Sequence, residues 1–205
     1  MKYKKLLALA LVAATSPAFA SNFTVDFEKT WDYGTDVNDY YNGGTASDLS
    51  TGGSNLGVSF VNVSGLSNDS NFTYYTNAPT MQGVAYAHDT AFMNVAAGVD
   101  NALSFSYSSA TAVTAAVTAW TGLNGTGTNL GSFDLAANSS SAYEGWSATT
   151  FNFLGTAQSF DLTTAGANLV ALDNISAVPV PAAAWLFGSA LAMFGAVRCR
   201  GKASV

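Results

Sequence analysis

Two carboxylates far apart in the sequence could share a metal ion. Glu28 follows the alternating stretch 23–27, and Asp173 interrupts an apolar stretch, 169–172, just before Ile175. A charge in an apolar stretch is costly unless it has a partner. Carboxylates at close range repel each other, and calcium, which prefers oxygen ligands, relieves that repulsion. We therefore predict a structural calcium site at Glu28 and Asp173, with plain solvent exposure of both groups as the alternative.

Residues suited to catalysis are few. His88 is the only histidine, so one chain cannot build a metal centre from several histidines. A Ser-His-Asp triad stays open, but the sequence holds no Gly-x-Ser-x-Gly motif, and His88-Asp89 is interpreted as a loop pair. Glu28 and Glu144, the only glutamates, could form the carboxylate pair of a glycosidase. We expect no enzyme, with a secreted hydrolase that acts on polysaccharide as the alternative.

The segment 21–177 predicts β-strands that would position these groups. Residues 23–28 and 103–108 alternate between apolar and polar side chains, which is typical of half-buried strands. Strands are predicted at residues 23–27, 58–63, 72–76, 84–87, 103–108, 113–120, 130–135, 149–153, 160–163 and 169–175. Residues 31–53 are expected to form a long loop. The expected fold class is all-β, a jelly-roll-like β-sandwich whose first and last strands can be neighbours. Such neighbours would bring Glu28 and Asp173 together.

Segment 21–177 is strongly acidic. Thirteen Asp and Glu residues against one basic residue, Lys29, give it a formal charge of −12. Such a surface repels the phosphate backbone, so nucleic acid is excluded as a partner. The only cysteine is Cys199, so no disulfide can form within the segment.

Aromatic residues among Asn and Asp favour a glycan ligand. Exposed aromatic faces suit the rings of sugars, although most aromatic side chains pack in a core. The candidates are Tyr33, Tyr40, Tyr41, Tyr74, Tyr75 and Trp120.

The beginning of the chain is typical of an exported protein. Three lysines precede the apolar stretch 6–14, and Ala18 and Ala20 form a small-x-small cleavage site. Residues 1–20 are therefore expected to be a secretory signal peptide.

The end of the chain predicts a membrane anchor. Val178, Pro179 and Pro181 open a stretch without charge that extends to residue 197. Because prolines disfavour helix in the residues before them, one transmembrane helix is expected at about 182–197. Trp185 suits the headgroup level near its start.

A basic tail follows this helix directly. Residues 198–202 include Arg198, Arg200 and Lys202. Positive residues beside a membrane span stay in the cytoplasm, so segment 21–177 should face outward.

This order of proline motif, hydrophobic helix and basic cluster resembles the PEP-CTERM sorting signal. The sequence Val178-Pro179-Val180-Pro181-Ala182 is similar to the Val-Pro-Leu-Pro-Ala variant; the family pattern has Glu between the prolines where this chain has Val180. The resemblance implies that residues 178–205 are a sorting signal, handled at the inner membrane by an exosortase-like membrane protease. The membrane-anchored precursor would then give a cell-surface or extracellular protein.

The ends of the middle segment also resemble a known group. Phe27-Glu28 and Asp173-Asn174-Ile175 are similar to the ends of carbohydrate-binding-type jelly rolls found ahead of such tails. We expect an exported protein of the cell surface, extracellular matrix or biofilm, with extracellular polysaccharide as its partner. A purely structural surface component is the other alternative.

Overall fold

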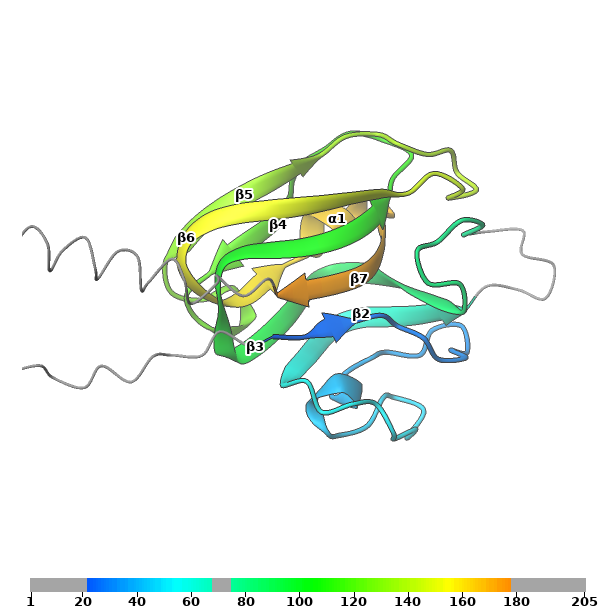
Figure 1. The fold of residues 1–205 in the computed structure, drawn as a ribbon, viewed down its shortest axis with the longest axis horizontal. Helices are drawn as coiled ribbons and strands as arrows, with labels where there is room; N and C mark the ends of the chain where they lie inside the picture. The colour runs from blue at the N-terminus through cyan, green and yellow to red at the C-terminus, as the bar shows by residue number, and fades with distance from the viewer. Residues whose placement is uncertain (1–21, 68–74, 178–205) are drawn as a thin grey trace, which may run out of the picture.

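The computed structural model describes residues 22–67 and 75–177 and shows an all-β protein (Figure 1). Its strands are β1 (Thr24–Val25), β2 (Val58–Ser67), β3 (Gly83–Ser108), β4 (Val113–Trp120), β5 (Asn129–Leu135), β6 (Ser147–Asp161) and β7 (Ala171–Ala177). The helices are short: η1 (Tyr40–Asn42), η2 (Leu123–Gly125) and α1 (Thr163–Ala167). All strand pairs are antiparallel, in the order β1-β7-β3-β6-β4-β5, with β2 on β3. The expected all-β class is confirmed, and the arrangement is compatible with a sandwich.

Within residues 22–67 and 75–177, no helix is long and apolar enough to cross a membrane. The predicted signal peptide, 1–20, and the predicted transmembrane helix, 182–197, lie outside the described residues.

Strands β3 and β6 form one long, bent ribbon, which Figure 1 shows running side by side. They pair from Phe92 with Asp161 to Tyr107 with Ser147, with two shifts of register. Gly98 lies in the first shift, and Asn101 and Gly155 in the second, all at positive φ. Extra residues of this kind form bulges that bend a strand without ending it. The ribbon therefore curves around the core.

This continuity corrects several predicted strand boundaries. The predicted strands 84–87 and 103–108 are parts of one strand, β3, and the strand predicted at 149–153 continues through Gly155 as β6. Of the strand predicted at 72–76, residues 75 and 76 lie in a turn instead, and the others are outside the described residues.

Strand β7 joins β1, the first described strand, to the rest of the sheet. Val25 of β1 pairs with Ile175 of β7, so the expected neighbourhood of the first and last strands is confirmed. Leu172 of β7 pairs both with Ala85 and with Tyr107, which belong to the two halves of β3. Strand β7 thus closes the sheet around the core.

The core combines side chains from the beginning, middle and end of the described region. Phe27, Met93, Phe160 and Leu172 are among its fully buried residues. The rings of Phe153 and Phe160 meet edge to face, with centroids 5.7 Å apart. Such burial supplies the main stabilising free energy of the domain.

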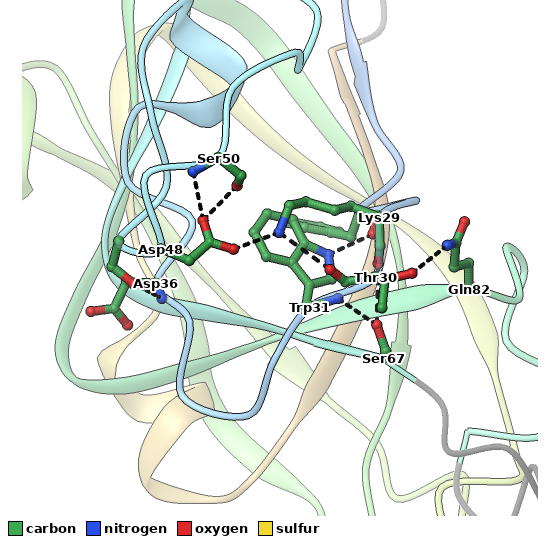
Figure 2. A network of polar contacts seen from close by, with 10 residues as sticks. Lys29, Thr30, Trp31, Asp36, Asp48, Ser50, Ser67 and Gln82 are labelled. Carbon is green, nitrogen blue, oxygen red and sulfur yellow. Dashed lines mark hydrogen bonds and ion pairs between the residues drawn. The ribbon is translucent and has the colours of Figure 1, made fainter.

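The long segment before β2 is fixed by Trp31 and Lys29 (Figure 2). Trp31 is buried over Gly65, where a Cβ atom would overlap the indole ring. Its Nε1 donates a hydrogen bond of 2.8 Å to the Phe27 carbonyl oxygen. The Nζ atom of Lys29 lies 4.3 Å from the centroid of the Trp31 ring and 2.9 Å from Oδ2 of Asp48. The only lysine of the segment therefore links its loops through one ion pair, with Asp48, and through cation–π contacts with Trp31 and Tyr40.

Replacing Phe160 by alanine should destabilise the fold strongly. Phe160 is fully buried, whereas Leu154 of the same strand is 85% exposed. We expect Phe160→Ala to lower the free energy of unfolding by about 3 to 5 kcal/mol, because it leaves a cavity. Leu154→Ala, the matched control, should change it by less than about 0.5 kcal/mol. Denaturant unfolding of both variants measures the difference, and equal losses would contradict the described core.

Candidate functional site

Asp173 is a fully buried carboxylate held by a neighbouring loop. Thr80 donates to it from its backbone nitrogen, 3.0 Å from Oδ2, and from its hydroxyl, 2.9 Å from either carboxylate oxygen. The backbone nitrogen of Asn174 donates to Oδ1 at 2.7 Å. These bonds satisfy the charge, yet burial still raises the pKa of the Asp173 carboxyl to about 6.

Glu28 holds the same loop two residues further on. Its Oε1 accepts hydrogen bonds from the backbone nitrogens of Gln82, at 2.8 Å, and Gly83, at 3.2 Å. Glu28 is also close enough to Asp173 to raise the pKa of that carboxyl further. The fold therefore brings the two predicted calcium ligands to one segment, 80–83.

Both carboxylates bind backbone or hydroxyl donors in this arrangement. The described ranges 22–67 and 75–177 hold no group of three or more His, Cys, Asp or Glu residues able to bind a metal ion. Calcium at Glu28 and Asp173 would need further oxygens from the loop, and it stays a prediction.

The predicted processing residues lie outside the described residues. They are Ala18 and Ala20 of the signal peptide and Val178, Pro179, Pro181, Trp185, Arg198 and Arg200 of the sorting signal.

The aromatic glycan candidates have different surroundings. Tyr41 is buried, and Tyr40 is half-buried against Trp31. Tyr75 is half-buried with its ring against Tyr143, Trp120 is half-buried, and Tyr74 is outside the described residues. Tyr33 is 87% exposed and so offers its ring to solvent.

His88 lies in strand β3, not in a loop, and contacts a buried serine. The Ser64 hydroxyl donates to Oδ1 of Asp36 at 2.7 Å and lies 2.8 Å from Nε2 of His88. Since that hydroxyl proton points to Asp36, Nε2 must carry the proton of the neutral imidazole. The serine thus lies between the other two residues, whereas a catalytic triad has the histidine in the middle. Ser64 is also fully buried, so its oxygen faces no substrate.

The two glutamates proposed as a carboxylate pair each bind other groups. Glu28 binds the loop at 82–83, and Oε2 of Glu144 accepts a hydrogen bond from the Ser140 hydroxyl in the loop before β6.

A shallow groove that the sequence did not predict lies across β7, β3 and β6. Its volume is about 300 Å³, and its lining is uncharged. The polar lining residues are Ser104, Ser106, Thr149, Thr150, Asn174 and Ser176. Ser104 pairs with Ser176 on one side and with Thr150 on the other. The alternating serines at 103–108 were its only signal in the sequence.

The groove is an array of hydrogen-bonding groups in register. The hydroxyl oxygens of Ser104 and Thr150 are 2.8 Å apart. Each hydroxyl can both donate and accept, and adjacent strands place these groups about 4.8 Å apart. This arrangement can bind an uncharged ligand rich in hydroxyls that lies across the strands.

Comparison with known proteins gives little. No family model and no curated protein matches the chain. One solved structure that matches is described as the K2 cleaved adhesin domain of Lys-gingipain, with a TM-score of 0.41 and 13% identity over 77% of this chain and 99% of that chain. A likeness this weak says nothing about the ligand or activity of this chain.

Asp173 should make the stability of the fold depend on pH. The pKa of its carboxyl is about 6 in the folded protein and about 4 in an unfolded chain. Between these values the folded state keeps a proton that the unfolded chain releases. The free energy of unfolding therefore falls as the pH rises through this window and levels off above it. Asp173→Asn removes this titration, so the variant should gain stability relative to the native protein between pH 4 and pH 7.

Denaturant unfolding at a series of pH values measures this gain. Asp134→Asn, which removes an exposed carboxylate from β5, is the control. A difference between native protein and Asp173→Asn that is constant with pH would contradict the argument. The same titration in millimolar calcium tests the predicted metal, because calcium bound only by the folded state must stabilise the native protein and not the variant.

Proposed function

We propose that this chain is an exported protein of the cell surface or the extracellular polysaccharide matrix. Its middle segment is a jelly-roll-like β-sandwich, and its function is to bind glycan chains without cleaving them. The groove over β7, β3 and β6 carries this proposal, because it is an uncharged array of hydroxyls open to solvent. The signal peptide and the sorting-signal resemblance at the two ends support the location.

The chemistry of the groove favours a neutral glycan. Sugar hydroxyls pair well with Ser, Thr and Asn side chains, which can donate and accept in the same place. A glycan chain that crosses the strands would meet a new hydroxyl at each strand, as at Ser176, Ser104 and Thr150. An acidic polysaccharide would be repelled by the charge of −12 on segment 21–177.

Removing the groove hydroxyls should weaken glycan binding. The variant Ser104→Ala/Thr150→Val/Ser176→Ala loses three hydroxyls at little cost in shape. With about 1 kcal/mol for each hydrogen bond, affinity for a neutral polysaccharide should fall by about tenfold or more. Affinity electrophoresis or calorimetry with the purified protein and neutral polysaccharides measures this loss.

A second hydroxyl pair provides the control. Thr118 on β4 and Ser132 on β5 are 2.9 Å apart and lie outside the groove. Thr118→Val/Ser132→Ala should leave binding unchanged. Equal losses in both variants, or no binding of any neutral polysaccharide, would refute the groove as a glycan site and leave a structural role.

The same proposal assigns residues 178–205 to a PEP-CTERM-like sorting signal, removed at the inner membrane by an exosortase-like protease. The intact mass of protein released from the cell surface should then lack residues 185–205. Neutral residues in place of Arg198, Arg200 and Lys202 should leave unprocessed precursor, because the positive flank keeps the tail in the cytoplasm. A released protein whose mass includes the whole tail would contradict cleavage.

A further inference from the structure

Cations are nearly missing from the described part of the chain. Lys29 is the only Lys or Arg among residues 22–67 and 75–177, and Asp48 is its partner. The other described carboxylates therefore have no lysine or arginine to pair with. Such a charge distribution attracts cationic partners and repels anionic ones.

The surroundings of Lys29 show how this protein holds an ammonium group. Its Nζ lies 2.9 Å from Oδ2 of Asp48, 4.3 Å from the centroid of the Trp31 ring and 5.9 Å from that of the Tyr40 ring. Figure 2 shows this amine between the carboxylate and the indole. One carboxylate and two aromatic faces thus satisfy a single positive charge.

A second cluster that combines a carboxylate with aromatic rings lies on β2, β3 and the loop before β2. Asp36 and Ser64 form a backbone bridge, and Ser64 pairs with Tyr86 in the sheet. The Ser64 hydroxyl is hydrogen-bonded to Asp36 and His88. The rings of Tyr86 and His88 have centroids 4.9 Å apart. This network fixes one carboxylate beside two rings.

Tyr33 completes the group from the loop. Tyr33 lies three residues before Asp36 in the same loop. Burial raises the pKa of the Tyr86 phenol, and Tyr33 and Asp36 raise it further. Tyr33 and His88 are exposed, and Asp36 and Tyr86 are half-buried. Among the described residues no hydrogen-bond donor contacts Oδ2 of Asp36, and no lysine or arginine other than Lys29 is available to approach it.

We propose that Tyr33, Asp36, Tyr86 and His88 form a binding site, here named the amine site, for the primary ammonium group of an amine-bearing polysaccharide. The ammonium pairs with Oδ2 of Asp36 and lies against the tyrosine rings, as Lys29 does with Asp48 and Trp31. The amine site lies apart from the groove, which belongs to the second half of β3, to β6 and to β7.

The hydrogen-bonding groups around Asp36 favour an amino sugar over a lysine side chain. With Nε2 of His88 donating to Ser64, the neutral imidazole can accept a hydrogen bond from a ligand at Nδ1, to which none of the described residues donates. The phenol of Tyr33 adds a group that can donate and accept. An amino sugar carries hydroxyls next to its ammonium that can use both, whereas the carbon chain of lysine carries none.

Binding of glucosamine oligomers to the purified protein tests this proposal. Calorimetry should show binding of a glucosamine oligomer and not of its N-acetylated counterpart, because acetylation removes the charge. Tyr33→Ala and Asp36→Asn should each weaken binding by about threefold to tenfold. Asn can still accept the Ser64 hydrogen bond, and Tyr33 is exposed, so both variants should keep the fold. Asp134→Asn removes the same charge from β5 and should weaken binding by less than about twofold.

Three outcomes would overturn the amine site. Equal losses in Asp36→Asn and Asp134→Asn would mean diffuse attraction without a site. Equal binding of the N-acetylated oligomer would exclude recognition of the ammonium. Binding of polylysine that matches the sugar oligomer and is lost in the same variants would assign the site to basic proteins. The groove variant Ser104→Ala/Thr150→Val/Ser176→Ala should keep amine binding, so the two proposals fail independently.

Discussion

The pairing of β7 with β1 and with both halves of β3 is the constraint on which the domain depends. No disulfide can close segment 21–177, so sheet hydrogen bonds must do so. The same strand buries the carboxylate of Asp173, which the fold tolerates because Thr80 satisfies it. With β7 fixed in this way, Asn174 and Ser176 have defined places in the groove. The position of β7 therefore determines where the two ends of the segment meet, where Asp173 is buried and where the groove lies.

Much of the sheet could be predicted from alternation of apolar and polar residues, and the missed continuity of β3 and β6 has one cause. Strand β4 has the predicted bounds, and β5 begins one residue earlier than predicted. Strands β3 and β6 were each predicted as separate pieces, and Gly98, Asn101 and Gly155, residue types that usually end strands, lie between those pieces. In the structure these residues form bulges within continuous strands. Local sequence does not distinguish a bulge from a turn, since the difference depends on whether a partner strand continues alongside.

Some residues of the candidate sites could also be predicted from the sequence, and others could not. A charge inside the apolar stretch before Ile175 made Asp173 visible, and its burial follows the sequence pattern. Its partner Thr80 could not be predicted, because no local sequence pattern distinguishes this threonine from the others in the chain. The groove was missed for the same reason, since Ser104, Thr150 and Ser176 become a set only through cross-strand register. His88 was assigned to a loop with Asp89, although its partners Ser64 and Asp36 come from other parts of the chain.

The position of Lys29 also bears on how well the domain resists proteolysis. Proteases of the trypsin type cut only after lysine or arginine, and residues 21–177 offer them a single peptide bond, that between Lys29 and Thr30. The Lys29 side chain is occupied by Asp48 and Trp31, and its carbonyl oxygen accepts a hydrogen bond from Ser67. The Lys29–Thr30 bond is therefore protected from cleavage by such an enzyme while the loop stays packed. The scarcity of basic residues thus protects the domain against a whole class of digestive enzymes.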